Sequence, residues 1–411
     1  MDNTRKIDGL RWLTLAMQIL VGTSCAYVYC LSVYVGPLAE EFGWDPEIII
    51  VSYTLMMAMG LPGSIVGGYL RKKFGNRFVL KVGGIGFAAA IVISAFSVNA
   101  WMYVIMTGGL GAFCMYVVYV AQLENIGELF PDKRGMAMGI GVGGISIGTA
   151  MIVPVAEWLS RSYDLMHGIA IQGIVYGGLV FIVGFLMVEA PENYRPKGWN
   201  SETFSSANEG IEEVGSKNIS WKQVLKTPAF YILLLAIVAI MIFTTGFQSN
   251  NSLINQAALG VDSASGAWIY TAFMIASGVG SFVLGIQSDL FGGPLKTLTI
   301  WSIIVTLVGA ILLCIGVSTV WMYLIVTVAI GILGGGVLAV VPTLLMNEFG
   351  NMDFGIIYGM FIVAPTVASI FGPQLAVTKD ITQFFFIGVV CSAIGLILFM
   401  IASKMFVKNK R

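Results

Sequence analysis

Long apolar runs separated by short polar segments dominate the chain. Six runs bounded by charged residues lie near residues 11–36, 47–70, 78–98, 101–128, 135–158 and 167–188, and six more near 229–257, 264–288, 296–316, 320–347, 353–377 and 381–405. A helix needs about 20 residues to cross a bilayer, and the length of each run is close to or above this value. The runs lack the alternation of barrel strands, and lipid demands a backbone whose polar groups are paired internally. The pattern therefore predicts an all-α integral membrane protein with twelve transmembrane helices.

One long polar segment, residues 189–228, divides these runs into two sets of six. We therefore predict an N-terminal six-helix bundle over residues 1–188, a cytoplasmic linker over 189–228 and a C-terminal six-helix bundle over 229–411. The halves also repeat weakly. The loop at 67–77 corresponds to that at 285–294, and the segment 128–135 corresponds to 347–355. Internal repeats of this kind are typical of transporters built from two pseudo-symmetric bundles.

Positive charge predicts the orientation in the membrane. With the N-terminus in the cytoplasm, all Lys and Arg residues except Arg161 and Lys379 fall on the cytoplasmic side of the predicted spans. Cytoplasmic loops carry such an excess of positive charge. We expect a multi-pass protein of the plasma or bacterial inner membrane with both termini in the cytoplasm.

Composition narrows the class of function. The chain is 57% hydrophobic and only 11% charged, which excludes a soluble globular fold. Its net charge is zero, which excludes a basic surface for nucleic-acid binding. Five scattered cysteines and one histidine, His167, offer neither metal-ligand spacing, a disulfide framework nor a hydrolase triad. We expect no cofactor and no enzymatic activity. The expected partners are the lipid bilayer, a small organic solute and, as an open possibility, protons, with no obligate protein partner.

Four further segments point to a family. They read Arg-Trp-Leu-Thr-Leu (11–15), Phe-Pro-Asp-Lys-Arg-Gly (130–135), Thr-Pro-Ala-Phe-Tyr (227–231) and Ala-Ser-Ile-Phe-Gly (368–372). With these segments and the repeated loop signatures, the chain resembles the major facilitator superfamily, and within it the oxalate/formate antiporter and monocarboxylate transporter branch. The resemblance implies a substrate path between two bundles that rock about it, and movement of small organic acids by antiport or by symport with protons.

Two departures from that branch change the expected cargo. Where the antiporters place an arginine in the eighth span and a lysine in the eleventh, this chain has Ser281 and Pro365. An anion stripped of water in an apolar cavity needs an opposite charge or several donors, so we expect a monocarboxylate with an apolar or aromatic body rather than oxalate. Gly334 and Leu338 stand where the family has bulky aromatics, which would widen the cavity; alternatively, the glycines at 334–336 only allow close helix packing.

Uncharged polar side chains are the other candidates for substrate binding. Tyr116 and Tyr119 in span 4 and Tyr29 in span 1 each offer a ring to an apolar cargo and a hydroxyl to a carboxylate. The resemblance matches the family's own tyrosine to Tyr119. Gln248 and Asn251 share one face of the predicted span 7. That face either borders the substrate or emerges into water at the outer end of the helix.

Structural roles are expected for two other sets. Tyr34 and Tyr103 are predicted to belong to the aromatic belt at the membrane interface. A close-packing face, not a phosphate loop, is predicted for the glycines of span 5, namely Gly139, Gly141, Gly143, Gly144 and Gly148.

Acidic and basic residues gather at the cytoplasmic ends of the spans. Glu124 is the deepest acid and is expected either to pair with a gate cation or to carry a transported proton. Asp289 holds the acidic position of the repeated loop signature, whereas its counterpart in the first half is Lys72. We therefore expect an asymmetric gate or proton-coupling group that comprises Glu124, Glu348, Asp289, Arg71, Lys72, Arg77 and Arg134.

Taken together, these patterns predict a secondary active transporter that works by alternating access. Two alternatives stay open. One is a transporter of a neutral or cationic organic solute coupled to protons through Glu124. The other is a transporter-like sensor that signals through residues 189–228.

Overall fold

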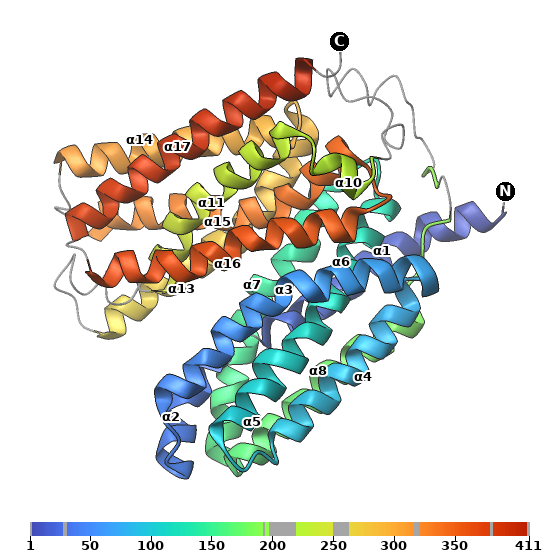
Figure 1. Ribbon diagram of the computed structural model, residues 1–411, viewed down its shortest axis with the longest axis vertical. Helices are drawn as coiled ribbons and strands as arrows, with labels where there is room; N and C mark the ends of the chain where they lie inside the picture. Colours follow the sequence, from blue (N-terminus) through green and yellow to red (C-terminus); the bar gives the residue numbers. More distant parts are fainter. Residues whose placement is uncertain are drawn as a thin grey trace. The chain divides into compact units, whose positions relative to one another are not determined.

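The computed structural model describes residues 2–27, 31–191, 194–196, 219–249, 263–315, 320–378 and 381–408, and within them all regular secondary structure is helical (Figure 1). The first part of the chain forms α1 (Asp2–Cys25), α2 (Leu31–Phe42), α3 (Pro46–Phe74), α4 (Asn76–Ser94), α5 (Ala100–Val104), the π-helical η2 (Ile105–Gly111), α6 (Ala112–Leu129), α7 (Arg134–Ser162) and α8 (Leu165–Leu186). The rest forms α10 (Trp221–Val224), α11 (Pro228–Ser249), α13 (Ser263–Leu290), α14 (Pro294–Ile315), α15 (Val320–Phe349), α16 (Phe354–Thr378) and α17 (Ile381–Lys408).

Ten helices of the described residues are long and apolar enough to cross a membrane, with α5, η2 and α6 counted as one continuous helix. The long helices α1 and α7 complete the twelve. The predicted twelve-helix, all-α architecture is therefore confirmed. The first span differs in detail, because α1 begins at Asp2 and ends at Cys25, and α2 is a separate helix that ends at Phe42. Apolar length locates a membrane crossing, but it does not locate the ends of the helix that makes the crossing.

The ends of the second span show how local sequence sets helix boundaries. The side chain of Asp45 accepts a hydrogen bond from the Glu47 N–H, and Pro46 occupies the first helical turn of α3. The helix ends at Gly75, whose φ of 82° is a left-handed conformation that favours glycine. The corresponding loop after α13 also turns at a left-handed glycine, Gly292, with the same φ of 82°. The repeated loop signatures therefore fold alike.

The chain divides into two compact units. Unit 1 comprises Met1–Asp132, Gly144–Trp199 and Asp353–Ile362, and unit 2 comprises Lys133–Gly143, Asn200–Met352 and Val363–Arg411. Two helices thus contribute to both units, since α7 begins in unit 2 and α16 begins in unit 1. The bundles predicted in simple chain order, 1–188 and 229–411, stay a prediction.

Three of the predicted glycines of α7, Gly139, Gly144 and Gly148, occupy close-packing positions, whereas a Cβ on Gly143 would make only ordinary contacts. In unit 2, a Cβ built on Gly139 would lie 2.4 Å from the carbonyl oxygen of Ser281. In unit 1, a Cβ on Gly144 would lie 2.9 Å from the carbonyl oxygen of Ile19. Only a residue without a side chain permits such backbone approach.

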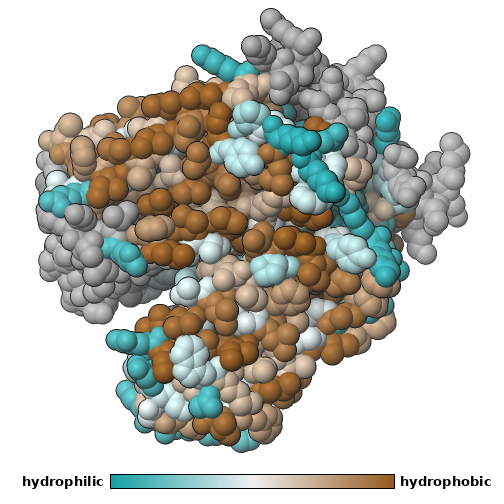
Figure 2. Space-filling view, viewed as in Figure 1, coloured by the Kyte–Doolittle hydropathy of each residue, from teal (hydrophilic) through white to brown (hydrophobic). Residues whose placement is uncertain are grey.

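Apolar side chains cover much of the visible surface of each unit, as Figure 2 shows in brown. Such extensive apolar exposure suits a surface that faces lipid. The exposed tryptophans include Trp101, Trp268 and Trp321. By contrast, Tyr34 and Tyr103 are fully buried, so the prediction that they form an interfacial belt is wrong.

Tyrosine can be buried when its hydroxyl finds a partner. The hydroxyl of Tyr34 accepts a hydrogen bond from Gln172 of α8. The ring of Tyr103 packs 6.1 Å from that of Trp44. Position near the end of an apolar run therefore did not reveal whether a tyrosine points toward lipid or toward the interior of unit 1.

Candidate functional site

A pair of buried tyrosines joins α6 and α16 within unit 1. The hydroxyl of Tyr358 donates to that of Tyr119 across 3.4 Å, and the two residues are only 6% and 9% exposed. The O–H of Tyr119 is left to donate to another group. Tyr358 in turn stacks on Phe354, with ring centroids 5.4 Å apart. The pair thus offers a polar tip in aromatic surroundings.

Tyr116 lies one turn from Tyr119 on α6 and is half-buried. Its hydroxyl lies 3.9 Å from the Sδ atom of Met57 on α3. Of the predicted tyrosines, Tyr116 and Tyr119 are therefore brought together, whereas Tyr29 lies outside the described residues. Sequence reasoning missed Tyr358. The signal that could have found it, a lone tyrosine inside the apolar run of α16, does not reveal its partner.

Two glutamines continue the polar line on α6 and α1. Nε2 of Gln122 donates to the carbonyl oxygen of Gln18 at 2.9 Å. Both residues are 0% exposed. The predicted set did not include either residue.

In unit 2, Ser281 closes the contact between α13 and α15. Its hydroxyl donates to the carbonyl oxygens of Ser277, at 3.1 Å, and Gly335, at 2.9 Å. A Cβ on Gly335 would lie 1.9 Å from the Ser277 carbonyl oxygen, and one on Gly336 would lie 2.0 Å from Leu284. These two glycines and Ser281 are therefore required for helix packing.

Gly334 differs from its two neighbours. A Cβ built there would meet nothing closer than Thr244 at 3.5 Å, an ordinary contact. Leu338 follows one turn later on the same face of α15, and both residues are half-buried. The glycine run thus divides into close packing at 335 and 336 and an ordinary van der Waals contact at 334.

The remaining predicted binding residues lie on other helices of unit 2. Pro365 is half-buried within α16, and Gln248 is half-buried in the last turn of α11. Asn251 lies outside the described residues. Within the described ranges, no group of three or more His, Cys, Asp or Glu residues could hold a metal ion.

An ion-pair network occupies the charged end of unit 1. Nε of Arg71 lies 3.0 Å from Oε2 of Glu124, and the same guanidinium pairs with Glu128. Glu124 is only 2% exposed. Its other carboxylate oxygen borders Gly355, where a Cβ would come within 3.1 Å. The expected pairing of Glu124 with a gate cation is thus present, and the cation is Arg71.

The matching contact in unit 2 is a helix cap. The carboxylate of Asp289 accepts hydrogen bonds from the N–H groups of Gly135 and Met136, each at 2.8 Å. These N–H groups belong to the first turn of α7, where a negative charge is stabilising. Asp289 therefore fixes the start of α7 to the end of α13.

The equivalent position in unit 1 carries the opposite charge and forms a side-chain ion pair instead. Lys72, the counterpart of Asp289 in the repeat, pairs with Asp353. Asp353 directly precedes α16, and its carbonyl oxygen accepts from the N–H groups of Ile356 and Ile357. The acid thus stands at the helix start and the cation stands in the loop signature.

The other predicted gate residues have separate contacts. Arg134 is 3% exposed, and its guanidinium donates to Oδ1 of Asn347 at 2.8 Å. Glu348 is the half-buried neighbour of Asn347 on α15. Nε of Arg77 donates to the carbonyl oxygen of Met187 at 2.8 Å, which ties α4 to the end of α8.

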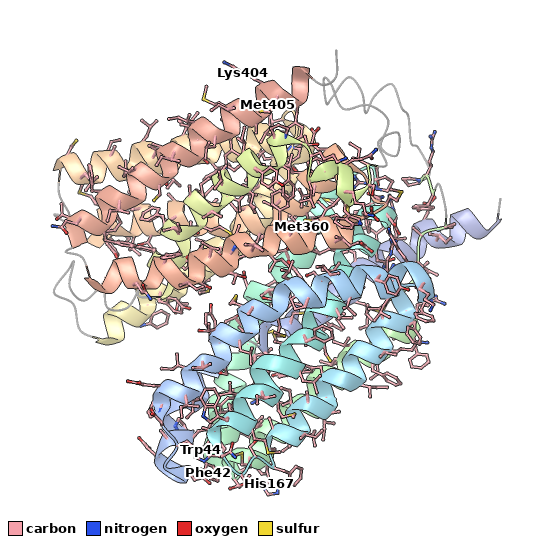
Figure 3. The ribbon with its side chains drawn as sticks, in the orientation of Figure 1. Phe42, Trp44, His167, Met360, Lys404 and Met405 are labelled. Carbon is pink, nitrogen blue, oxygen red and sulfur yellow. The ribbon has the colours of Figure 1, made fainter. Side chains whose placement is uncertain are left out.

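The opposite end of unit 1 carries Phe42, Trp44 and His167 (Figure 3). The rings of Phe42 and Trp44 lie 5.2 Å apart. Nδ1 of His167 lies 2.8 Å from a carboxylate oxygen of Asp164, and this hydrogen bond lowers the pKa of Asp164. The histidine side chain is 80% exposed, so it forms a surface pair rather than part of a buried site.

Comparison with known proteins places this geometry among transporters. A family model described as Major Facilitator Superfamily matches residues 17–255 and 238–410. The oxalate:formate antiporter of Oxalobacter formigenes is 24% identical over 388 residues, which cover 89% of this chain and 84% of that protein. Monocarboxylate transporter 13 of Rattus norvegicus is 24% identical over 325 residues, which cover 78% and 71%. The solved structure of the proton:xylose symporter XylE bound to 6-bromo-6-deoxy-D-glucose has a TM-score of 0.71 at 16% identity and 96% coverage of both chains, which shows a shared fold.

Proposed function

The chain belongs to the Major Facilitator Superfamily, and from this premise we propose that it moves a monocarboxylate with an apolar or aromatic body by alternating access. Its relatives and fold neighbours are transporters rather than enzymes. One relative is an oxalate:formate antiporter and another is a monocarboxylate transporter. The proposal selects the second kind of cargo.

The observation that carries this proposal is the neutral hydroxyl pair of Tyr119 and Tyr358. No Lys or Arg lies within residues 82–132 or 354–378, which contain both tyrosines. A dicarboxylate stripped of water would lack a compensating cation there. A single carboxyl group needs only a few donors, which a phenol hydroxyl supplies.

Apolar surroundings favour a cargo with an apolar or aromatic body. Tyr116 contacts Met57, and Phe354 stacks on Tyr358. Pockets that bind small organic molecules combine such apolar walls with a few polar groups.

We assign the ion pairs Arg71–Glu124 and Lys72–Asp353 and the Asp289 cap of α7 to the cytoplasmic gate. Contacts that form in one state and break in the other bias the balance between inward and outward states. Orientation follows from the positive charges, so both termini are assigned to the cytoplasm and the protein to the plasma or inner membrane.

A second candidate function is the transport of a neutral or cationic solute coupled to protons through Glu124. The deep burial of this acid favours it, since buried acids in spans are often functional. The ion pair with Arg71 favours the gate instead. We therefore propose monocarboxylate transport ahead of proton-coupled transport of a neutral or cationic solute.

The test is uptake by the purified protein in liposomes. Labelled benzoate, lactate and oxalate are supplied separately with an inward proton gradient, and empty liposomes correct for passive entry. We expect saturable benzoate uptake that exceeds lactate uptake, and no oxalate uptake. Robust oxalate exchange, or uptake of organic amines alone, would overturn the proposal.

A further inference from the structure

Two buried glutamines carry polar atoms that no described residue of unit 1 satisfies. Nε2 and Oε1 of Gln18 and Oε1 of Gln122 are buried and have no hydrogen-bond partner among the described residues. The two residues are joined by a hydrogen bond from Nε2 of Gln122 to the main-chain oxygen of Gln18. Buried polar side-chain atoms almost always have a partner. Such atoms on two bonded glutamines indicate a group that the described residues do not supply.

The position of this pair links it to the tyrosines. Gln122 follows Tyr119 by three residues on α6, so both lie on one face of the helix. Tyr119 bonds to Tyr358. The glutamine pair therefore continues the line of neutral polar groups toward the end of α6 that precedes α7.

Neither α1 nor α6 supplies a cation beside this pair. The nearest basic residue along α1 is Arg11, seven residues and about 10 Å before Gln18. Arg11 is already engaged, because its guanidinium contacts both carboxylate oxygens of Asp132 at 2.8 and 3.1 Å. Within residues 112–129 of α6 there is no Lys or Arg. An ionised carboxylate beside Gln18 would thus be an uncompensated buried charge.

A protonated carboxyl group fits the same atoms. The amide N–H of Gln18 can donate to the carbonyl oxygen of the acid, while the acid O–H donates to the amide oxygen. Both unpartnered atoms of the Gln18 side chain are then satisfied by one neutral group. Because the acid has a single O–H, Gln122 contributes as a donor instead: the second N–H of its Nε2 can donate to an oxygen of the acid.

We propose that Gln18, with Gln122, binds the carboxyl group of the substrate in its protonated form, so that the substrate itself carries the coupling proton. This inference rests on the proposed monocarboxylate transport. A carboxylate takes one proton from water on the uptake side and crosses as the neutral acid. It then returns the proton to water on the other side. Each cycle moves one carboxylate and one proton with no net charge, and no side chain changes its protonation.

The experiment measures benzoate uptake into liposomes that contain the wild-type protein, from pH 5 to pH 7. Above the pKa of an acid, its neutral fraction falls about tenfold for each pH unit. We therefore expect the KM for total benzoate to rise about tenfold per unit, while the KM expressed as benzoic acid stays constant. Benzamide, which presents the same N–H and C=O groups without a titratable proton, should compete equally at every pH.

Substitutions then test the residues. Gln18→Leu should raise the KM for benzoic acid at least tenfold and remove competition by benzamide, and Gln122→Leu should raise it several-fold. Gln172→Leu is the matched control, because Gln172 is 1% exposed and its Nε2 donates to Tyr34, while its Oε1, like that of Gln122, has no partner among the described residues. Its KM should stay within about twofold of the wild type.

Several results would overturn the inference. They are a KM for total benzoate that does not change with pH, or unchanged KM values in both Gln18→Leu and Gln122→Leu. If Gln18→Leu does not fold, two other measurements test the inference: the KM of Gln122→Leu, and the competition of benzamide with benzoate for uptake by the wild-type protein. Absence of all monocarboxylate uptake by the wild type would instead refute the proposed function, so the two failures are distinguishable.

Discussion

At the scale of single residues, the hydroxyls of Tyr119 and Tyr358 are the groups most directly tied to substrate recognition. Tyr119→Phe should raise the KM for benzoate roughly five- to tenfold, because a lost hydrogen bond costs about 1 kcal/mol or somewhat more. Tyr358→Phe should have a smaller effect, since its hydroxyl acts through Tyr119. Initial rates of uptake in liposomes give both values.

The matched control for these variants is Tyr323→Phe in unit 2. Tyr323 is fully buried, like the pair, but its hydroxyl has no hydrogen-bond partner among the described residues. This variant should keep the wild-type KM. A KM that is unchanged in Tyr119→Phe would remove this residue from the proposed binding site.

Glu124 supports a second prediction at this scale. Glu124→Gln breaks the ion pair with Arg71 and should slow both gradient-driven uptake and solute exchange. The expected factor is at least roughly tenfold, because breaking a buried pair costs about 3–5 kcal/mol and about 1.4 kcal/mol already gives tenfold. The same rates are measured in Glu128→Gln, whose side chain is more exposed and should matter less. Loss of gradient-driven uptake with exchange preserved would identify Glu124 as the proton carrier.

Sequence reasoning found side chains of the right chemistry but not their partners. Tyr119 and Glu124 stood out because a hydroxyl or an acid within an apolar run is unusual. Tyr358 and Gln18 did not stand out, since nothing in their local sequence shows which helix they face. A contact such as Tyr119 to Tyr358 joins residues 239 positions apart, and only tertiary packing decides it.

At the scale of helices, the charge exchange between the two repeats is the main finding. Asp289 caps α7 with its carboxylate, whereas Lys72 meets an acid that precedes α16. Lys72→Asp should place two acids together and slow transport about threefold, since the lysine side chain is 41% exposed and such pairs contribute little. The double variant Lys72→Asp, Asp353→Lys should recover most of the rate. It recreates the arrangement of Asp289, in which the acid faces a helix start.

The control for this pair is Lys73→Asp, at an exposed neighbouring position. It changes the net charge equally and should leave the rate within about twofold of the wild type. Transport rates and thermal unfolding of all three variants are compared in the same lipid. If the double variant is slower than either single substitution, the two side chains do not act as a pair.

The number and type of helices could be predicted because lipid demands long apolar helices. Helix ends depend on finer signals. Gly75 and Gly292 turn the chain at equivalent loops, as the repeated signature indicated, but no such signal marks the end of α1 at Cys25. Helix ends that depend on packing rather than on caps are not readable from hydropathy.

At the scale of the whole molecule, the two units show why chain order is an incomplete guide to packing. The first residues of α7 belong to unit 2 and the rest of that helix to unit 1. The first residues of α16 belong to unit 1 and the rest of that helix to unit 2. Hydropathy predicts how many helices there are, whereas membership of a unit depends on contacts far apart in sequence. One contact holds the start of each of these helices in its unit. Asp289 binds Gly135 at the start of α7, and Lys72 binds Asp353 at the start of α16.

Orientation is the prediction that belongs to this scale. Placing both termini in the cytoplasm leaves Arg161 and Lys379 as the only basic residues outside. In a background without cysteine, Val98→Cys, in the exposed loop between α4 and α5, should react with an impermeant maleimide in intact cells. Lys226→Cys, exposed after α10, should react only after the membrane is permeabilised.

Each variant is its own internal control, because permeabilisation should raise labelling of Lys226→Cys at least roughly tenfold and leave that of Val98→Cys nearly unchanged. The reverse pattern would invert the orientation. It would also move the Arg71–Glu124 and Lys72–Asp353 pairs to the outer side, so that the proposed gate would close the opposite entrance. Transport assays in liposomes of mixed orientation cannot make that distinction, which is why the labelling must be done in cells.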